Sequence, residues 1–244
     1  MNPMFETLVF PQDARILEVG CGYGNWAAWA SVQVPQGAVL AVDLDPKMVD
    51  WAGQQYPSPA YPNLRFLQAD ARELQFEDEP FDFAMSNACL HYLEHPGQAF
   101  GAMARHLRPG GRLCVTCLGQ GNLRDLFKAL ERVMQDKDWK PYFEGPTRSG
   151  SLADARSCEP WLEEAGLVKM QGRLFNETVT FPHREAFRDW FGSNFGFYFE
   201  AVPNAFRGQF CEAVIQSYCR RQGNKGPVRV FRVWLQLDAV KRHQ

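Results

Sequence analysis

The sequence predicts an α/β fold in which helices cover both faces of a doubly wound parallel sheet. Short apolar runs alternate with helix-like segments through the first half of the 244-residue chain. Such runs are typical of parallel strands buried on both faces, and right-handed crossovers wind them into a doubly wound sheet. A glycine-rich turn follows the first apolar run. Ligands of such folds bind beyond the carboxyl ends of the strands, so we expect a site at that edge.

The elements of the first half follow from local signals. Asp45-Pro46 supplies an N-cap and a first-turn proline for one helix, and Arg108-Pro109-Gly110-Gly111 ends another. Apolar residues at helical or strand spacing place the rest. We expect strands over 15–19, 38–42, 64–67, 81–85 and 113–118, and helices over 25–32, 46–55, 100–107 and 123–134.

The second half of the chain is less regular. Residues 138–160 are rich in Pro, Gly and Ser and read as a long loop. We expect a short helix over 161–165, a strand over 168–181, an aromatic-rich stretch over 187–199, a helical stripe over 206–218 and a strand over 228–239. In the last strand, Phe231, Val233, Leu235 and Leu237 share one face, and Arg232, Gln236 and Asp238 share the other.

Composition excludes several classes of protein. The net charge of −2 argues against a dedicated nucleic-acid binder. No apolar run is long enough to span a bilayer, and the start lacks a secretory signal. The seven irregularly spaced cysteines are therefore expected to be free thiols in a reducing cytoplasm. Cys114 and Cys117 form a lone C-x-x-C whose side chains point to opposite strand faces, so we expect no metal site.

The glycine turn at residues 18–24 reads Glu-Val-Gly-Cys-Gly-Tyr-Gly. Glycines allow positive φ and let a ligand lie against bare backbone, and the following helix begins with unpaired N–H groups. Glu18 would repel a pyrophosphate but suits a cofactor that carries an ammonium and a sulfonium. No Gly-Lys-Ser/Thr follows, which excludes a phosphate loop of the Walker type.

Three further polar residues stand at predicted strand ends. Asp43 can accept hydrogen bonds from two ribose hydroxyls, and Asp70 can accept one from an adenine amino group. Asn87 follows the fourth predicted strand at the same edge of the sheet. Each acid taken alone is also compatible with a cap or turn role. Their succession at strand ends favours a nucleoside site.

These motifs resemble those of class I S-adenosylmethionine-dependent methyltransferases. The matching segments are 18–24, 43–48, 68–71 and 107–113, and together they cover most of residues 13–120. The group most similar to the chain comprises small-molecule enzymes acting on trans-aconitate, malonyl-carrier protein and juvenile-hormone acid, which share the segment Ser86–Leu93. The resemblance implies a Rossmann-like, seven-stranded sheet, mostly parallel with an antiparallel last strand, and a helical cap insertion.

The resemblance also implies roles at individual positions. Glu18 and the glycine turn would hold the methionine moiety, Asp43 the ribose, and Asp70 the adenine amino group, with Asn87 near the methyl. The implied cofactor contacts are Glu18, Gly20, Cys21, Gly22, Gly24, Trp26, Asp43, Leu44, Met48, Asp70, Ala71 and Asn87. His91 and Tyr92 would face the substrate. His91 serves either as a general base or as a packing and orienting residue.

The predicted organisation is a core over 1–137, a loop or lid over 138–160, last strands over 161–181 and 227–244, and a substrate cap over 182–226. Relatives usually carry a longer N-terminal helical region that closes over the cofactor, whereas only Met1 to Phe10 precede the first strand here. That region is therefore missing, replaced by the cap and loop, or lost by truncation.

The cap's aromatic residues exceed what a small core needs and favour a largely apolar or aromatic substrate. The expected contacts are Trp190, Phe191, Phe195 and Tyr198, with Arg188 as a candidate clamp for a carboxylate. The prediction is a cytoplasmic enzyme that moves a methyl group from S-adenosylmethionine to an oxygen or nitrogen atom, leaving S-adenosylhomocysteine. A nicotinamide-dependent oxidoreductase and a catalytically silent cofactor-binding subunit remain as alternatives.

Overall fold

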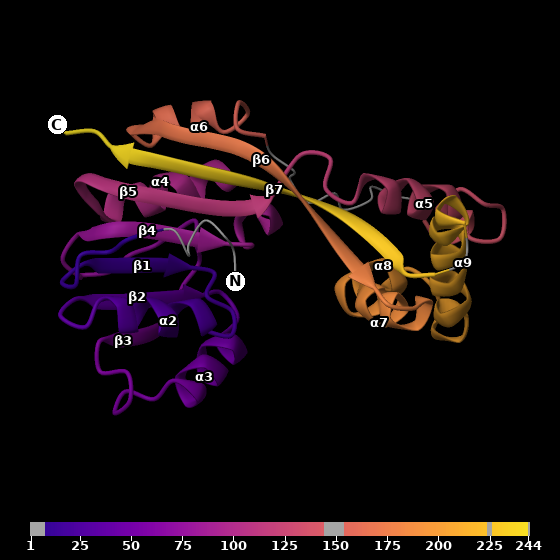
Figure 1. The fold of residues 1–244 in the computed structure, drawn as a ribbon, viewed down its shortest axis with the longest axis horizontal. Coiled ribbons are helices and arrows are strands. Elements are labelled where there is room, and N and C mark those ends of the chain that lie inside the picture. The colour runs from indigo at the N-terminus through magenta and orange to yellow at the C-terminus, as the bar shows by residue number, and fades with distance from the viewer. Residues whose placement is uncertain (1–7, 144–153, 224–225, 244) are drawn as a thin grey trace. The chain divides into compact units, whose positions relative to one another are not determined.

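A seven-stranded sheet organises the computed structural model, which describes residues 8–143, 154–223 and 226–243. The strands lie in the order β3-β2-β1-β4-β5-β7-β6 (Figure 1). β1 to β5 pair in parallel, and β7 runs antiparallel to β5. The predicted sheet with its antiparallel last strand is confirmed. The strands are β1 (Arg15–Val19), β2 (Ala38–Asp43), β3 (Leu64–Gln68), β4 (Phe81–Asn87), β5 (Leu107–Leu118), β6 (Leu167–Phe181) and β7 (Val228–Lys241).

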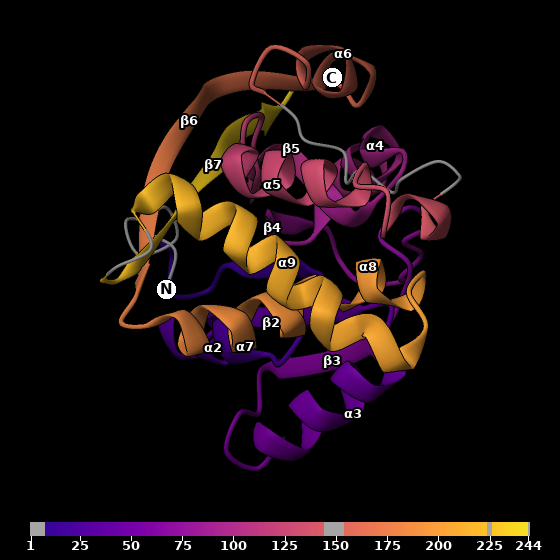
Figure 2. The ribbon, with the colours of Figure 1, turned by 90° about the vertical axis from the view of Figure 1, so that its right-hand side faces the viewer.

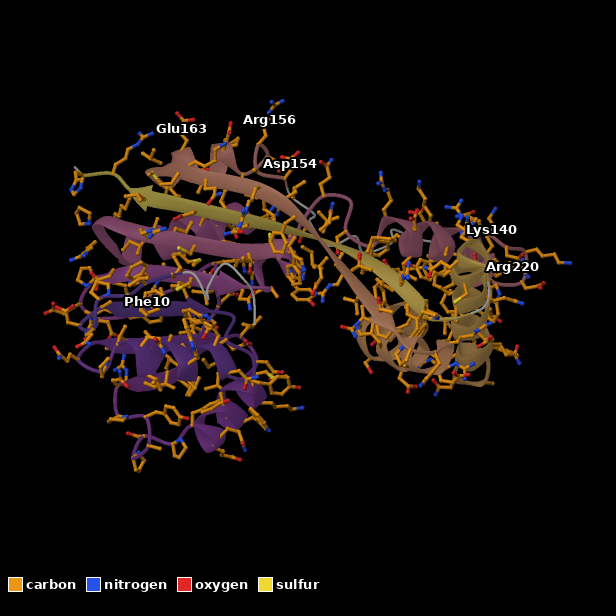
Figure 3. The ribbon with its side chains drawn as sticks, in the orientation of Figure 1. Phe10, Lys140, Asp154, Arg156, Glu163 and Arg220 are labelled. Carbon is orange, nitrogen blue, oxygen red and sulfur yellow. The ribbon has the colours of Figure 1, made fainter. Side chains whose placement is uncertain are left out.

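Successive side chains of the central strands point to opposite faces of the sheet, and they form one core on each face. Ile16 of β1 packs with α2 (Asn25–Gln33), whereas its neighbour Leu17 packs with α4 (Pro96–His106) and α6 (Glu159–Glu164). Successive strand residues point to opposite faces, so an apolar run feeds both cores. Phe10, labelled in Figure 3, extends the α2 side. Its ring packs edge-on to Phe83, with ring centroids 4.9 Å apart.

Local signals set the element boundaries near the site. The Asp45 side chain accepts a hydrogen bond from the Lys47 N–H at 2.9 Å and caps α3 (Pro46–Gln55), as predicted. The short helical turn η1 (Leu90–Tyr92) follows β4. These elements place the ends of β1, β2, β4 and β5 along the edge where the sequence predicts a ligand.

Two compact units divide the chain. Unit 1 comprises residues 1–120, 150–175 and 234–244, and unit 2 comprises 121–149 and 176–233. Within unit 2, α9 (Arg207–Cys219) lies between α5 (Arg124–Met134) and α7 (Arg184–Asn194) (Figure 2). The unit's smaller elements are α8 (Gly196–Glu200), η2 (Lys140–Tyr142), η3 (Asn204–Phe206) and η4 (Arg220–Gln222). This division differs from the predicted boundary at residue 137, because α5 packs in unit 2.

β5 departs from its expected start. The segment Arg108–Gly111 ends α4 as predicted, but it is already part of β5. Gly110 has a φ of 76°, and the pairing register with β4 shifts between Phe81 and Phe83. The Pro-Gly-Gly sequence therefore forms an irregularity inside a strand, where a left-handed glycine is tolerated.

The buried face of β7 changes along its length, and the apolar face that the sequence indicates is exposed at Phe231. Leu235 and Leu237 are buried in unit 1, as expected. In unit 2, however, Val228 and Val230 are buried and Phe231 is 56% exposed. The strand serves a different core in each unit, so a single period-2 pattern cannot describe it.

All seven cysteines are free thiols. Cys114 and Cys117 lie in the cores on opposite faces of the sheet, as their spacing predicts. Burial is the largest cause that raises the pKa of each of the seven thiols. Within the described residues, no helix has the length and apolar character to cross a membrane, and no group of three or more His, Cys, Asp or Glu is placed to hold a metal ion. Residues 1–7 and 144–153 of the expected N-terminal region and loop lie outside the described residues.

Candidate functional site

The glycine turn between β1 and α2 is anchored to the end of β2. The Gly20 and Cys21 N–H groups donate to the Val42 carbonyl at 2.8 and 2.9 Å. The next N–H, from Gly22, donates to Asp43 Oδ2 at 2.8 Å. The conformation of the turn thus depends on the carboxylate that the sequence assigns to a ribose.

The three glycines of the turn all have positive φ, between 51° and 78°, but their surroundings differ. A Cβ on Gly20 would lie 2.2 Å from Cys89 Sγ, and one on Gly24 would lie 2.8 Å from the Phe66 ring. A Cβ on Gly22 would meet nothing within 4 Å. Gly20 and Gly24 are therefore required for packing, whereas Gly22 leaves bare backbone beside open space.

Glu18 is a buried acid with an unsatisfied oxygen. Its side chain is 2% exposed, and Oε2 has no hydrogen-bond partner. Burial raises its pKa well above the ordinary 4.5, and the nearby Asp43 charge raises it further, while a hydrogen bond with the Ala27 backbone lowers it. A buried acceptor without a partner is costly, so this site favours a donor that arrives with a ligand.

Asp43 has capacity left for a ligand. Besides the Gly22 N–H on Oδ2, its Oδ1 accepts from the Asp45 N–H at 3.0 Å. Each carboxylate oxygen has room for a second donor, which fits a pair of ribose hydroxyls.

Asp70 is largely occupied by a neighbour. Arg72 donates to it from its backbone N–H at 2.9 Å and from its guanidinium at 2.6 to 3.2 Å. These hydrogen bonds hold the pKa of Asp70 below its ordinary value. An adenine amino group would have to share the carboxylate with Arg72, a competition that the sequence pattern did not reveal.

The end of β4 is tightly constrained. Asn87 Oδ1 accepts from the Thr116 hydroxyl at 2.6 Å, and the Ala88 N–H donates to the Thr116 carbonyl at 2.8 Å. Ala88 has a φ of 55°, in the left-handed region that disfavours residues with a Cβ. Cys89 then packs beneath Gly20, so this strand end and the glycine turn are in direct contact.

His91 is buried and Tyr92 is exposed. The Leu118 N–H donates to His91 Nδ1 at 3.4 Å, and the His91 ring lies 4.1 Å from the Tyr92 ring. Tyr92 is 79% exposed. The two residues that were expected to face the substrate thus occupy different environments, one beneath the surface and one on it.

The remaining expected cofactor contacts are divided between surface and core. Leu44 is exposed and Met48 is half-buried, whereas Cys21 and Ala71 are buried. Trp26 packs in the core beside Phe10 and Trp29. These positions lie in the glycine turn, after β2 and β3, and at the starts of α2 and α3.

The expected substrate contacts lie in unit 2, mostly in its core. Phe191, Phe195 and Tyr198 are buried there, and Trp190 is half-buried. Arg188 pairs with Glu212, which also pairs with Arg184. The aromatic excess is thus used in large part by the unit's own core.

Sequence reasoning missed four residues that shape the site. Thr116 fixes Asn87, Arg72 engages Asp70, Ala88 carries the left-handed backbone, and Cys89 packs on Gly20. Arg72 lies two residues from Asp70, so its position was a signal that could have been used. The others depend on strand pairing, which a single sequence does not specify.

The site suits the expected cofactor, S-adenosylmethionine. Its ammonium would supply the donor that Glu18 Oε2 lacks, and Asp43 has acceptors left for the ribose. The open side of Gly22 gives a path for close approach to the backbone. Glu18, Asp43, Asp70 and Asn87 all belong to unit 1.

Comparisons with known proteins identify the family of the chain. A family described as "Methyltransferase domain" matches residues 17–115. A malonyl-[acyl-carrier protein] O-methyltransferase from Paenibacillus sp. (strain JDR-2) is 31% identical over 194 residues, which cover 78% of this chain and 68% of that protein.

A trans-aconitate 2-methyltransferase from Deinococcus radiodurans is 38% identical over 102 residues, and the match spans 42% of this chain but only 37% of that protein. Among solved structures, a methyltransferase-like protein from Bacillus halodurans C-125 covers 98% of this chain and 98% of its own, with a TM-score of 0.69 at 18% identity.

Proposed function

The chain belongs to the S-adenosylmethionine-dependent methyltransferases, and we propose that it methylates an oxygen or nitrogen atom of a small, largely apolar molecule. The family membership carries the reaction type and the cofactor. What we propose is the identity of the acceptor and of the residues that act on it. Glu18, Asp43 and Asp70 are proposed to hold the cofactor through its amine, ribose and base.

The pairing of Asp43 with the Gly22 N–H is the observation that supports the binding site most directly. One carboxylate sets the shape of the turn and retains acceptor capacity toward a ligand. Glu18 contributes a buried oxygen that lacks a donor. Both features are explained if a cationic nucleoside lies along the open side of Gly22.

When bound, S-adenosylmethionine supplies an electrophilic methyl group on a sulfonium. The protein's task is then to hold the acceptor in line with that methyl group, and such positioning is worth roughly 7–11 kcal/mol. Asn87 stands at the end of β4, where it can orient the methionine end of the cofactor. Tyr92 offers an exposed ring and hydroxyl at the same edge of unit 1.

The names of relatives indicate the class of acceptor. The Paenibacillus relative is named for malonyl-[acyl-carrier protein], and the Deinococcus relative for trans-aconitate. Both names describe small acids or their carrier-bound forms. An apolar or aromatic acceptor remains the proposal, with half-buried Trp190 as the proposed contact.

Calorimetry with S-adenosylhomocysteine tests the binding site. The wild type is expected to bind it, and Asp43→Asn is expected to weaken binding by about 10–150-fold, which corresponds to losing hydrogen bonds to a charged group. NADH serves as the control ligand. Binding of NADH in preference to S-adenosylhomocysteine would contradict the proposal.

A transfer assay tests the substrate class. Methyl-labelled S-adenosylmethionine is incubated with a panel of hydrophobic acids, phenols and indoles. Label in at least one of them is expected. Tight cofactor binding with no labelled acceptor in a wide panel would count against a small apolar substrate.

A further inference from the structure

β5 fixes two polar side chains, Asn87 and His91, at the carboxyl end of the sheet in unit 1. The Thr116 hydroxyl donates to Asn87 Oδ1 at 2.6 Å, and the Leu118 N–H donates to His91 Nδ1 at 3.4 Å. Asn87 and Thr116 face each other across the β4–β5 pairing, and Thr116 is fully buried. Because β5 is buried in the sheet, both donors are held in place by the fold.

These contacts determine the chemistry that each side chain offers. The hydrogen bond from Thr116 fixes which branch of the Asn87 amide is the oxygen, so the other branch is the NH2 group, which only donates. A neutral imidazole has one lone pair in its plane, on the nitrogen that lacks the proton. The Leu118 N–H takes that lone pair at Nδ1, so the proton of His91 resides on Nε2. His91 cannot accept another proton without breaking this contact.

The backbone beside Asn87 is also held in place by β5. Ala88 is left-handed, a conformation that disfavours a residue with a Cβ. The Thr116 carbonyl accepts the Ala88 N–H, so one residue of β5 holds both the side chain of Asn87 and the strained residue after it. Strain that neighbouring contacts maintain is typical of functional sites.

We propose that Thr116 and the Leu118 N–H are positioning groups that set Asn87 and His91 as hydrogen-bond donors, so that the acceptor enters already deprotonated, as a carboxylate. This inference rests on the proposed function. A carboxyl group is ionised at neutral pH, whereas phenols and alkyl amines hold their protons there. A carboxylate oxygen forms the new C–O bond as the methyl–sulfur bond breaks, and the electron pair of that bond remains on sulfur. An anion and a cation yield a neutral ester and a neutral thioether, and no proton has to be removed.

The tautomer of His91 can be measured without a substrate. A two-bond ¹⁵N–¹H correlation spectrum of histidine-labelled protein distinguishes the two neutral tautomers and the imidazolium, and His91→Asn identifies the signal by its loss. The Nε2–H form is expected at neutral pH. An Nδ1–H form or an imidazolium would overturn the inference whether or not the enzyme's substrate is known.

Matched acceptor molecules test whether the enzyme prefers a carboxylate. Biphenyl-4-carboxylate, 4-phenylphenol and 4-phenylbenzylamine share a biphenyl skeleton and differ in the acceptor group. Label from S-adenosylmethionine is expected in the acid, as a base-labile ester. Label in the phenol or amine but not in the acid would overturn the inference and leave the proposed function intact. Failure to bind S-adenosylhomocysteine would instead overturn the proposed function. If none of the three is labelled, the tautomer decides.

Two variants separate positioning from proton transfer. His91→Asn keeps an acceptor for the Leu118 N–H, and turnover of the acid is expected to fall by about tenfold. Loss of a general base would instead cost about 10²–10⁴-fold. Thr116→Val is expected to lower kcat by about tenfold with little change in KM, and Thr116→Ser, which keeps the hydroxyl, should restore it. Equal loss in Val and Ser would contradict a positioning role.

Discussion

The two units of this chain serve different purposes, and unit 1 is nearly twice as long as unit 2. Unit 1 arranges polar groups along one sheet edge, where backbone N–H groups hold Asp43, Asp70 and His91. Unit 2 packs aromatic rings on one another, as in the stacked pair Phe187 and Tyr218. Unit 1 carries 12 Lys and Arg against 18 Asp and Glu, and unit 2 carries 14 against 10. Lys140 and Arg220 are among the cations of unit 2 (Figure 3).

This contrast shows that residue type alone does not identify a binding site. In unit 1 the functional candidates are polar groups with unused hydrogen-bonding capacity. In unit 2 most candidates are apolar groups whose contacts are already satisfied within the unit. The contrast leads to four predictions.

The largest effect on the free energy of unfolding is expected from a substitution in the core of unit 2. Phe210 is fully buried, and Phe210→Ala should destabilise the protein by about 3–5 kcal/mol, because it removes a large ring from a packed core. Phe206, on the preceding turn, is 42% exposed, and Phe206→Ala is the matched control with a change within about 0.5 kcal/mol. Denaturant titration measures both. Equal losses would contradict the assignment of Phe210 to the core.

Two glycines of unit 1 should respond differently to a methyl group. Gly20→Ala combines left-handed strain with overpacking against Cys89 and should cost about 2–5 kcal/mol. Gly22→Ala carries only the strain, about 1–2 kcal/mol, but should weaken S-adenosylhomocysteine binding because its methyl group enters the open space. Thermal melts and calorimetry on both variants separate the effects. If Gly22→Ala binds S-adenosylhomocysteine as tightly as the wild type, the turn is not part of the ligand site.

Glu18 should reveal a conflict between stability and function. Its raised pKa means that the folded protein binds the proton more tightly than the unfolded chain, so this residue lowers stability as pH rises above about 4.5. Glu18→Gln should therefore raise the melting temperature at neutral pH, with the gain vanishing in acid. The same variant should weaken S-adenosylhomocysteine binding. A gain that persists unchanged in acid would contradict this origin.

The smallest effect tests the face change in β7. Val230→Ala should cost about 1–2 kcal/mol, because it removes buried methyl groups from unit 2. Phe231→Ala removes a larger but exposed side chain and should change stability by less than about 0.5 kcal/mol. Chemical denaturation of the two variants compares them. The reverse order would restore the face predicted from the sequence.

The sequence alone predicts unit 1 well because its signals are local. β1 begins and ends where the apolar run does, and Asp45-Pro46 starts α3 as expected. The polar residues at strand ends were identified because parallel strands bring their carboxyl ends to one edge. The glycine spacing likewise identified the turn.

What the sequence could not predict depends on contacts between distant residues. The Thr116 bond to Asn87 requires the register of β4 against β5, which no local pattern specifies. The placement of α5 in unit 2 depends on its packing with α9, and the face change in β7 depends on which unit surrounds each half of the strand. The aromatic residues of unit 2 resembled a pocket because density in a sequence does not distinguish a lining from a core.

The seven thiols, five buried and two half-buried, have a practical consequence for solution work. Reagents such as maleimides attack thiolates, and raised pKa values keep all seven native cysteines in the unreactive form at neutral pH. A cysteine introduced at an exposed position, such as Gln216→Cys on α9, should therefore label much faster than the native set. The wild-type background is thus suited to attaching a single fluorophore without first removing its own sulfhydryls.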